Sequence, residues 1–366
     1  MEEWKEYKLG DVLTIKYGKD HKQLADGDIP IYGSGGIMRY GERSLYDGPS
    51  ILIPRKGSLN NVIYADKPFW TVDTMFWSII NDSIANPLFV YYSICKKDFA
   101  SLNVGSAVPS LTVPVIEDID ILLPPKATQD KVVSILKSLD DKIELNRHIN
   151  DNLEQQGQAL FNYYFIDTPE LLGEFSVGSL ADAANYVNGL AMQKYRPISG
   201  EKGLPVLKIK ELGQGRIDSS SDFCSNEIDS YYKVYDGDVI FSWSGTLIVK
   251  IWCGGKCGLN QHLFKVSSKT TPKWFYYFWT KHHLDNFIRI AKDKAVTMGH
   301  IKREELEKAE VLFPNNSVMK KLDTLMAPFL DQIIEKECEI RKLALLRDTL
   351  LPKLISGELV INDINN

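Results

Sequence analysis

The sequence predicts an α+β protein built from two duplicated α/β modules, separated and followed by long helices that pair as an antiparallel coiled coil. The first observation is an internal repeat: an offset of about 190 residues brings Tyr46-Asp47-Gly48 onto Tyr235-Asp236-Gly237. The second is the alternation, within each half, of short apolar runs with Gly, Pro, Asn and Asp turns. The third is a heptad pattern at the end of each half.

The repeat also predicts the domain organisation. Solenoid repeats recur every 20–50 residues, so a period this long indicates a duplicated domain. We expect a first module, a central helical segment, a second module and a C-terminal helical segment at residues 1–123, 124–170, 171–313 and 314–366.

Each module is expected to combine mostly short strands with one or two helices. The apolar runs predict strands and helices at these places: strands Ser50–Ile53 and Met75–Ile80 with a helix opened by Pro87, then strands Asp238–Phe241 and His262–Val266 with a helix from Pro272 to about Ile290.

Both halves end in the same heptad frame of about four heptads, roughly 29 residues. The inward positions predict a coiled-coil seam of Leu136, Leu139, Ile143, Asn146 and Leu153 in the first helix, with Met326, Phe329, Ile333, Ile340 and Leu343 in the second. The alternative is two ordinary amphipathic helices, each docked separately on its own module.

Polar residues interrupt this frame at matching positions. Asn146 coincides with Lys336, and Gly157 coincides with Arg347. A polar residue at an inward position weakens a seam but fixes its register, so we expect that role for Asn146. Pro328 lies inside the second pattern and is expected to kink the helix or to split off a short leading helix.

Composition excludes several classes of protein. An apolar share of 44% indicates a globular chain, and no apolar run reaches the length of a membrane span. The five scattered cysteines suit reduced thiols in a cytoplasmic protein. The net charge of −5 counts against a non-specific nucleic-acid coat, although residues 175–313 carry 19 basic and 15 acidic side chains.

Several motifs that suggest enzyme or metal chemistry are interpreted more simply. Asn86-Pro87-Leu88-Phe89 resembles an adenine methyltransferase motif but is better explained as a helix N-terminus, and Tyr32-Gly33-Ser34-Gly35-Gly36 as a turn. Cys253, Cys257 and His262 lack a second ligand pair for zinc. No catalytic constellation, metal site or cofactor is therefore predicted.

The chain resembles the specificity subunit of a type I restriction–modification system over essentially its whole length. The resemblance is carried by the Ile121-Leu122-Leu123-Pro124-Pro125 segment with Gln129, by the C-terminal run from Leu350 to Leu359, and by the stretches Gly105–Leu111 and Lys294–Ile301 that close the modules. The sequence departs from the family pattern at Met319, which stands in place of the helix-opening glutamine.

This resemblance implies a function. Each module would be a target recognition domain that reads one half of a split double-stranded DNA site, and the helices would act as a spacer and a dock for methyltransferase and restriction endonuclease subunits. The subunit itself would have no catalytic activity. Because the two copies have diverged, the DNA site would be asymmetric.

The candidate DNA contacts follow from the same alignment. Residues 54–61 follow the first predicted strand, residues 242–248 follow its repeat partner, and Gly57 matches Gly245, so both copies are expected to make the same turn with different side chains. The candidates for base or phosphate contacts are Arg55, Lys56, Ser58, Asn60, Ser106, Lys208, Lys210, Trp243, Ser244, Thr246, Thr297, His300 and Lys302. The alternative is a solvated turn without a partner.

Two other functions remain open at this point. One is a DNA methyltransferase with fused recognition domains, although the duplication leaves little room for a cofactor-binding domain. The other is a coiled-coil scaffold that retains modules without sequence preference.

Overall fold

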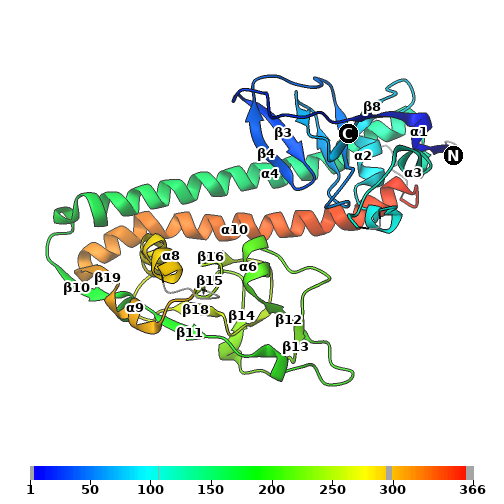
Figure 1. The fold of residues 1–366 in the computed structure, drawn as a ribbon. Coiled ribbons are helices and arrows are strands. Elements are labelled where there is room, and N and C mark those ends of the chain that lie inside the picture. The colour runs from blue at the N-terminus through cyan, green and yellow to red at the C-terminus, as the bar shows by residue number, and fades with distance from the viewer. Residues whose placement is uncertain (1–3, 106, 294–298, 360–366) are drawn as a thin grey trace, which may run out of the picture. The chain divides into compact units, whose positions relative to one another are not determined.

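The computed structural model describes residues 4–105, 107–293 and 299–359 and forms two compact units. The first contains residues 1–141 and 344–366, and the second contains residues 142–343. The long helices α4 (Lys126–Asn162) and α10 (Asn316–Ile355) each contribute to both units (Figure 1). Each unit is described below by itself.

The first unit contains one α/β module. Its elements are β1 (Lys5–Lys8), α1 (Leu9–Val12), β2 (Leu13–Tyr17), β3 (Ile29–Gly33), β4 (Gly36–Gly41), β5 (Ser50–Pro54), β6 (Ile63–Ala65), β7 (Trp70–Thr71), β8 (Met75–Ile80), α2 (Pro87–Ile94), α3 (Val113–Glu117) and β9 (Asp120–Leu123). They form sheets of order β2-β8-β5-β6, β4-β3-β7 and β1-β9. Only the β3–β7 pair is parallel among those pairings.

The second unit repeats this arrangement. Its elements are β10 (Phe175–Ser179), α5 (Leu180–Ala183), β11 (Asn185–Asn188), β12 (Leu204–Leu207), α6 (Ile209–Gln214), β13 (Phe223–Cys224), β14 (Lys233–Val234), β15 (Asp238–Ser242), β16 (Ile248–Trp252), β17 (Cys257–Leu259), β18 (Leu263–Ser267), α7 (Lys273–His282), α8 (Leu284–Asp293), α9 (Arg303–Lys308) and β19 (Glu310–Pro314). The sheets β11-β18-β15-β16 and β10-β19 match those of the first unit in order, and β13-β12-β17-β14 matches β4-β3-β7 with one further strand, β14. The parallel pair is again present, here between β12 and β17.

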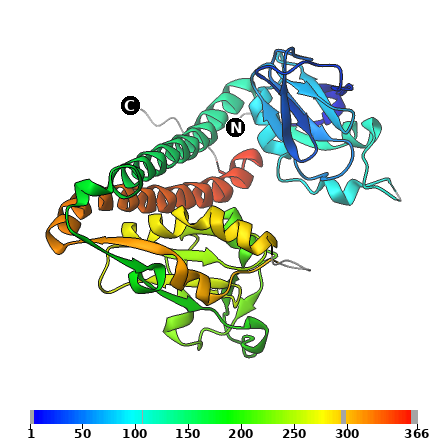
Figure 2. The ribbon, with the colours of Figure 1, turned by 60° about the vertical axis from the view of Figure 1, so that its left-hand side comes forward.

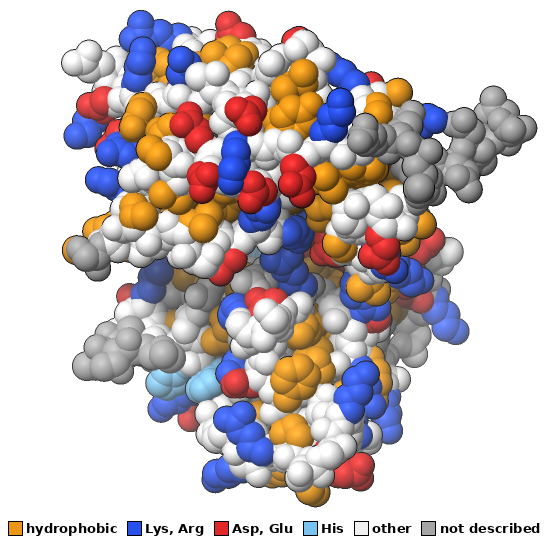
Figure 3. Space-filling view, turned by 90° about the vertical axis from the view of Figure 1, so that its right-hand side faces the viewer, with side chains coloured by type: hydrophobic (Ala, Val, Ile, Leu, Met, Phe, Trp, Pro, Cys, Tyr) orange, Lys and Arg blue, Asp and Glu red, His pale blue; other side chains and the backbone are white. Residues whose placement is uncertain are grey.

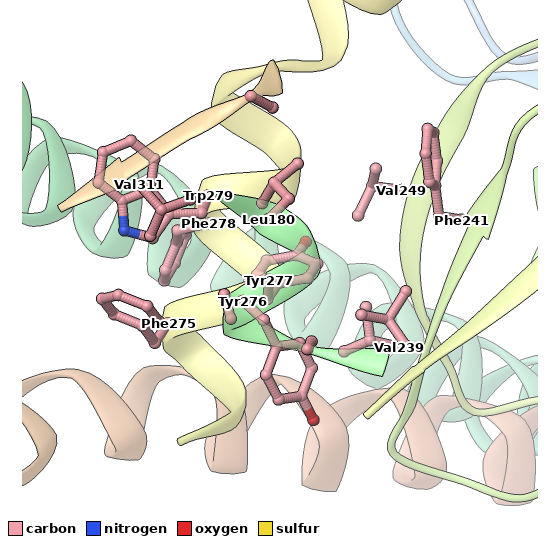
Figure 4. Close-up of a cluster of buried hydrophobic side chains, with 14 of the residues drawn as sticks. Leu180, Val239, Phe241, Val249, Phe275, Tyr276, Tyr277, Phe278, Trp279 and Val311 are labelled. Carbon is pink, nitrogen blue, oxygen red and sulfur yellow. The ribbon is translucent and has the colours of Figure 1, made fainter. Parts of the chain in front are cut away.

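Both modules bury an aromatic helix against the four-stranded sheet. In the second unit α7 buries Phe275, Phe278 and Trp279 in the same apolar cluster as side chains of β15 and β16, and these three rings lie on the far side of α7 from the labelled β15 and β16 side chains (Figure 4). In the first, α2 buries Phe89 and Val90 in the corresponding core. These apolar contacts supply most of the stabilisation, because each fully buried large side chain contributes about 1.5–3 kcal/mol.

The long helices complete both cores with equivalent side chains. Val132 and Leu136 of α4 are buried in the core of the first unit together with Leu351 and Leu354 of α10. In the second unit the corresponding positions, 190 residues along, are Leu322 and Met326 of α10, and Phe161 of α4 occupies the place of Leu351. The C-terminal motif therefore belongs to the core of the N-terminal module.

Within each unit the two helices run antiparallel, as Figure 2 shows. In the second unit Asn150 of α4 donates to Glu337 of α10 at 2.9 Å, and in the first Arg347 of α10 pairs with Asp140 of α4 at 2.7 Å. Of the predicted seam residues, six are buried and four partly buried; the buried ones are Leu136, Ile143, Asn146, Met326, Ile333 and Ile340, and the partly buried ones Leu139, Leu153, Phe329 and Leu343.

Tyrosines at equivalent positions of α2 and α7 form hydrogen bonds with carboxylates of α4. Tyr92 donates to Asp140 at 2.6 Å, and Tyr277 donates to Glu154, which Lys281 also contacts at 2.6 Å. Burial would raise the pKa of Glu154, but the charge of Lys281 and these hydrogen bonds lower it overall. Each module helix is thus held against a long helix by a hydrogen-bonded carboxylate.

Most of the predicted elements are confirmed. The predicted strands, the helix opened by Pro87 and the α+β class with paired helices all occur, and Asn86 caps α2 by accepting from the amides of Leu88 and Phe89. The methyltransferase-like segment is therefore a helix N-terminus. The modules carry more short helices than the one or two expected.

Three details differ from expectation. The helix after Pro272 is interrupted at His283, whose ring hydrogen-bonds the Glu310 carbonyl at 2.8 Å. Pro328 does not split off a leading helix: α10 continues from Asn316 to Ile355, and Met326 and Leu330 on either side of the proline are buried in the core. The helices contain 37 and 40 residues, longer than the heptad frame, which corresponds to about 56 and 60 Å at 1.5 Å per residue.

The two long helices begin in different ways. Gln129 is fully buried; its amide oxygen accepts from the Asn86 amide at 2.7 Å, and its nitrogen donates to the carbonyls of Ile84 and Pro124 at 3.0 and 2.9 Å. At the start of α10, Asn315 instead accepts from the amides of Ser317 and Val318. This cap explains how the helix begins with Met319 in the glutamine position.

Gln129→Leu should lower the free energy of unfolding by about 2–4 kcal/mol, because it leaves the buried Pro124 carbonyl and the partly buried Asn86 backbone amide and Ile84 carbonyl without partners. Urea denaturation measures the change. Gln155→Leu, at an exposed position of the same helix, is the control and should change stability by less than about 0.5 kcal/mol. Equal stabilities for the two variants would contradict this role.

Asn146→Leu should raise the free energy of unfolding by about 1–3 kcal/mol, because Asn146 is fully buried and neither amide atom forms a hydrogen bond of normal geometry. Asn150 is the matched control: Asn150→Leu removes the interhelical bond to Glu337 and should destabilise the protein. If Asn146 fixes the register, spin-label distances between α4 and α10 should broaden in Asn146→Leu. Destabilisation by Asn146→Leu would argue against this hypothesis.

Candidate nucleic-acid interface

The turns after β5 and β15 have the same backbone geometry. Gly57 and Gly245 have φ values of +90° and +67°, a region that favours glycine. The Gly57 amide donates to the Pro109 carbonyl at 3.2 Å, and the Gly245 amide donates to the Gly299 carbonyl at 2.9 Å. The expected equivalence of the two turns is confirmed.

The same stretches make a second equivalent bond. The Leu111 amide donates to the Arg55 carbonyl at 2.9 Å, and the Ile301 amide donates to the Trp243 carbonyl at 3.1 Å. Each turn is therefore held by the stretch that closes its module. The sequence singled out the turn and the closing stretch separately, and the fold brings them together in both units.

Each turn borders a surface hollow. The first unit has one of about 530 Å³ and the second has one of about 290 Å³. The first is lined by Gly57, Ser58, Leu59, Asn60, Asn61, Ala100 and Pro109. The second is lined by Gly245, Thr246, Leu247, Ile288, Ala291, Lys292 and Gly299. Residues of the same turn thus shape both hollows, and the side chains differ.

Arg55 is held in place in the first unit. Its guanidinium lies 5.5 Å from the ring centroid of Tyr17 and donates to the Asp73 carbonyl at 3.2 Å. Lys56 and Ser58 are exposed. Asn60 has a structural role: its side-chain nitrogen donates to Asp98 at 3.0 Å, and its side-chain oxygen accepts from the Ala100 backbone amide at 2.8 Å.

Trp243 takes the position of Arg55 in the second unit. Its indole Nε1 donates to Asn188 at 3.0 Å, and Asn188 corresponds to Tyr17, since each is the last residue of the equivalent strand, β11 or β2. The same pair of positions therefore interacts in both modules through different chemistry. The sequence did not single out Tyr17 and Asn188, because each lies well before its turn in the chain, Asn188 by 55 residues.

The remaining candidates in the second unit differ in exposure. Ser244 is buried, whereas Thr246, His300 and Lys302 are exposed. Lys208 pairs with Asp222, and Lys210 pairs with Asp218 at 3.0 Å. These carboxylates neutralise two of the proposed phosphate contacts, which makes Lys302 the stronger candidate. Ser106 and Thr297 lie outside the described residues.

Ionisable side chains on the face shown in Figure 3 are mixed in sign. Lys and Arg side chains alternate with Asp, Glu and apolar side chains, and do not form one continuous basic patch. Among the described residues, no group of three or more His, Cys, Asp or Glu is arranged to hold a metal ion. No helix in the described parts of the chain is long and apolar enough to cross a membrane.

Comparison with known proteins identifies the family. Residues 1–155 and 173–346 match the model of the type I restriction modification DNA specificity domain. A protein with two such modules and paired long helices is of the type I specificity-subunit class. The chain belongs to this family, which confirms the resemblance seen in the sequence.

Individual relatives agree with this assignment. The type I restriction enzyme MjaIX specificity subunit of Methanocaldococcus jannaschii is 25% identical over 394 residues, which cover 98% of this chain and 89% of that protein. The HindI specificity subunit of Haemophilus influenzae is 24% identical over 46% of this chain and 42% of its own length. The S subunit structure from M. genitalium shares the fold, with a TM-score of 0.61, 14% identity and coverage of 96% of both chains.

If Arg55 reads a base, Arg55→Ala should weaken binding by about 1–3 kcal/mol and relax selectivity at one position of one half-site. Selection of bound duplexes from a randomised pool measures this. Lys302→Ala is the comparison: a phosphate contact should weaken all sequences alike and reduce the salt slope by about 1. Unchanged affinity and selectivity in Arg55→Ala would remove it from the interface.

Proposed function

We propose that this chain is the DNA specificity subunit of a type I restriction–modification complex. Residues 1–123 and 171–313 would be the two target recognition domains, and residues 124–170 and 314–366 the helical segments between and after them. The domain bounds and the contact residues are part of the proposal.

One observation carries it: both modules present the same glycine turn, held by the same two hydrogen bonds beside a hollow, with different side chains. The backbone of the turn is the same in both copies while most of its side chains differ, which is the pattern expected of two readers of different sequences. Arg favours guanine in the major groove, whereas Trp, Ser and Thr offer different contacts. Two diverged readers on one chain favour a bipartite, asymmetric DNA site.

The helices would serve as spacer and dock. Because α4 and α10 each complete both module cores, a partner bound to the helices would be coupled to both recognition domains. The partners would be methyltransferase subunits and restriction endonuclease subunits. The chain itself would be non-catalytic and would need no cofactor of its own.

Genome-wide mapping of methylated adenines tests the proposal. Deletion of the coding sequence for this chain should abolish methylation of one split, asymmetric motif, and re-expression should restore it. An unchanged methylome in cells that express the partner methyltransferase would refute the proposal. Methyl transfer by the purified chain alone would instead indicate a fused methyltransferase, and DNA binding by the complex without sequence preference would indicate a scaffold.

A further inference from the structure

A glycine-rich hairpin lies against the turn of the first module. Ser34, in the short turn between β3 and β4, accepts from the Asn61 side chain at 2.9 Å. A Cβ atom on Gly57 would lie 2.8 Å from the Ser34 Oγ, so the two turns are in close contact. The hairpin therefore continues the surface formed by residues 54–61.

A β-bulge gives this hairpin two exposed apolar side chains. Ile31 pairs with Arg39 and Tyr32 pairs with Ile37, which leaves Met38 as the extra residue. Ile37 and Met38 are 49% and 58% exposed. Bulges re-aim side chains, and here two successive residues face solvent on an edge strand of the sheet.

The bulge is built into the packing. A Cβ atom on Gly33 would lie 2.6 Å from the Met38 sulfur, so glycine makes room for the Met38 side chain. Arg39 anchors the strand, since it donates to the carbonyls of His21 and Leu24 at 2.7 and 2.8 Å and pairs with Asp26 at 3.0 Å. The exposed apolar pair thus projects from a fixed strand.

The second module lacks this feature at the same place in the fold. Its strands β12 and β13 correspond to β3 and β4, but residues 208–222 with helix α6 connect them. Ile209 there takes the position of Ser34, and lies 3.5 Å from where a Cβ of Gly245 would be. The hairpin is therefore a difference between two otherwise equivalent surfaces.

We propose that the β3–β4 hairpin enters the major groove and that Ile37 and Met38 contact a thymine methyl group in the half-site of the first module. The proposal rests on the proposed DNA-reading function. The major groove admits a two-stranded β-ribbon, and the thymine methyl is its apolar group. Arg55 and Lys56 lie on the turn beside the hairpin and supply positive charge on the same surface.

The test compares DNA duplexes in which each thymine of the selected site is replaced by uracil, which lacks the methyl group. The unmodified chain, in complex with methyltransferase subunits, should lose about fourfold in affinity at one position of the half-site that responds to Arg55→Ala. In the double variant Ile37→Ser/Met38→Ser this sensitivity should disappear, and preference for the other half-site should remain. Val177→Ser, at a 60% exposed position in the second unit, controls for loss of surface apolar area.

The outcomes separate this inference from the function on which it rests. Suppose that the complex prefers a sequence in both half-sites. If no thymine is then sensitive to replacement by uracil, or if the double variant keeps this sensitivity, the hairpin contact alone is overturned. Loss of assembly with the methyltransferase subunits at unchanged DNA preference would assign the apolar pair to a protein partner and also overturn it. Absence of any sequence preference in the unmodified complex would overturn the proposed function itself.

Discussion

The burial of helix side chains in both module cores is the constraint on which the rest of the structure depends. Val132 and Leu136 enter the core of the first unit, and Leu322 and Met326 enter that of the second at positions 190 residues later. Each core is also completed by the far end of the other long helix. Neither module could separate from the helices without exposing a large apolar surface, at a cost of about 25 cal/mol per Å².

This constraint explains where the two copies are free to differ. Positions that face the cores keep their apolar character, and the turns keep Gly57 and Gly245 because a side chain would be strained at positive φ. The other side chains of the turns can differ, because the backbone hydrogen bonds that hold each turn do not depend on them. Arg55 and Trp243 can therefore occupy the same place and still interact with the equivalent neighbouring residue, Tyr17 or Asn188.

The sequence predicted the parts of this fold that are governed by periodicity. The heptad frame predicted two long helices, and the repeat aligned Gly57 with Gly245 before their common backbone geometry was known. It could not predict that the closing stretches hold these turns, because such hydrogen bonds join segments about 50 residues apart. The ion pairs of Lys208 and Lys210 were also not visible, since they depend on the path of the loop after α6.

The Gly-rich segment between β3 and β4 shows most clearly that the sequence pattern does not predict tertiary contacts. Tyr32-Gly33-Ser34-Gly35-Gly36 was predicted to be a turn, and the turn comprises Ser34 and Gly35 between the ends of β3 and β4. Nothing in its residues connected it with residues 54–61. The connection arises because parallel pairing of β3 with β7 places the hairpin beside the turn after β5. The second module preserves the parallel pair and replaces the hairpin connection by α6. A conserved sheet with exchanged connections can therefore change what each module contacts while its core stays the same.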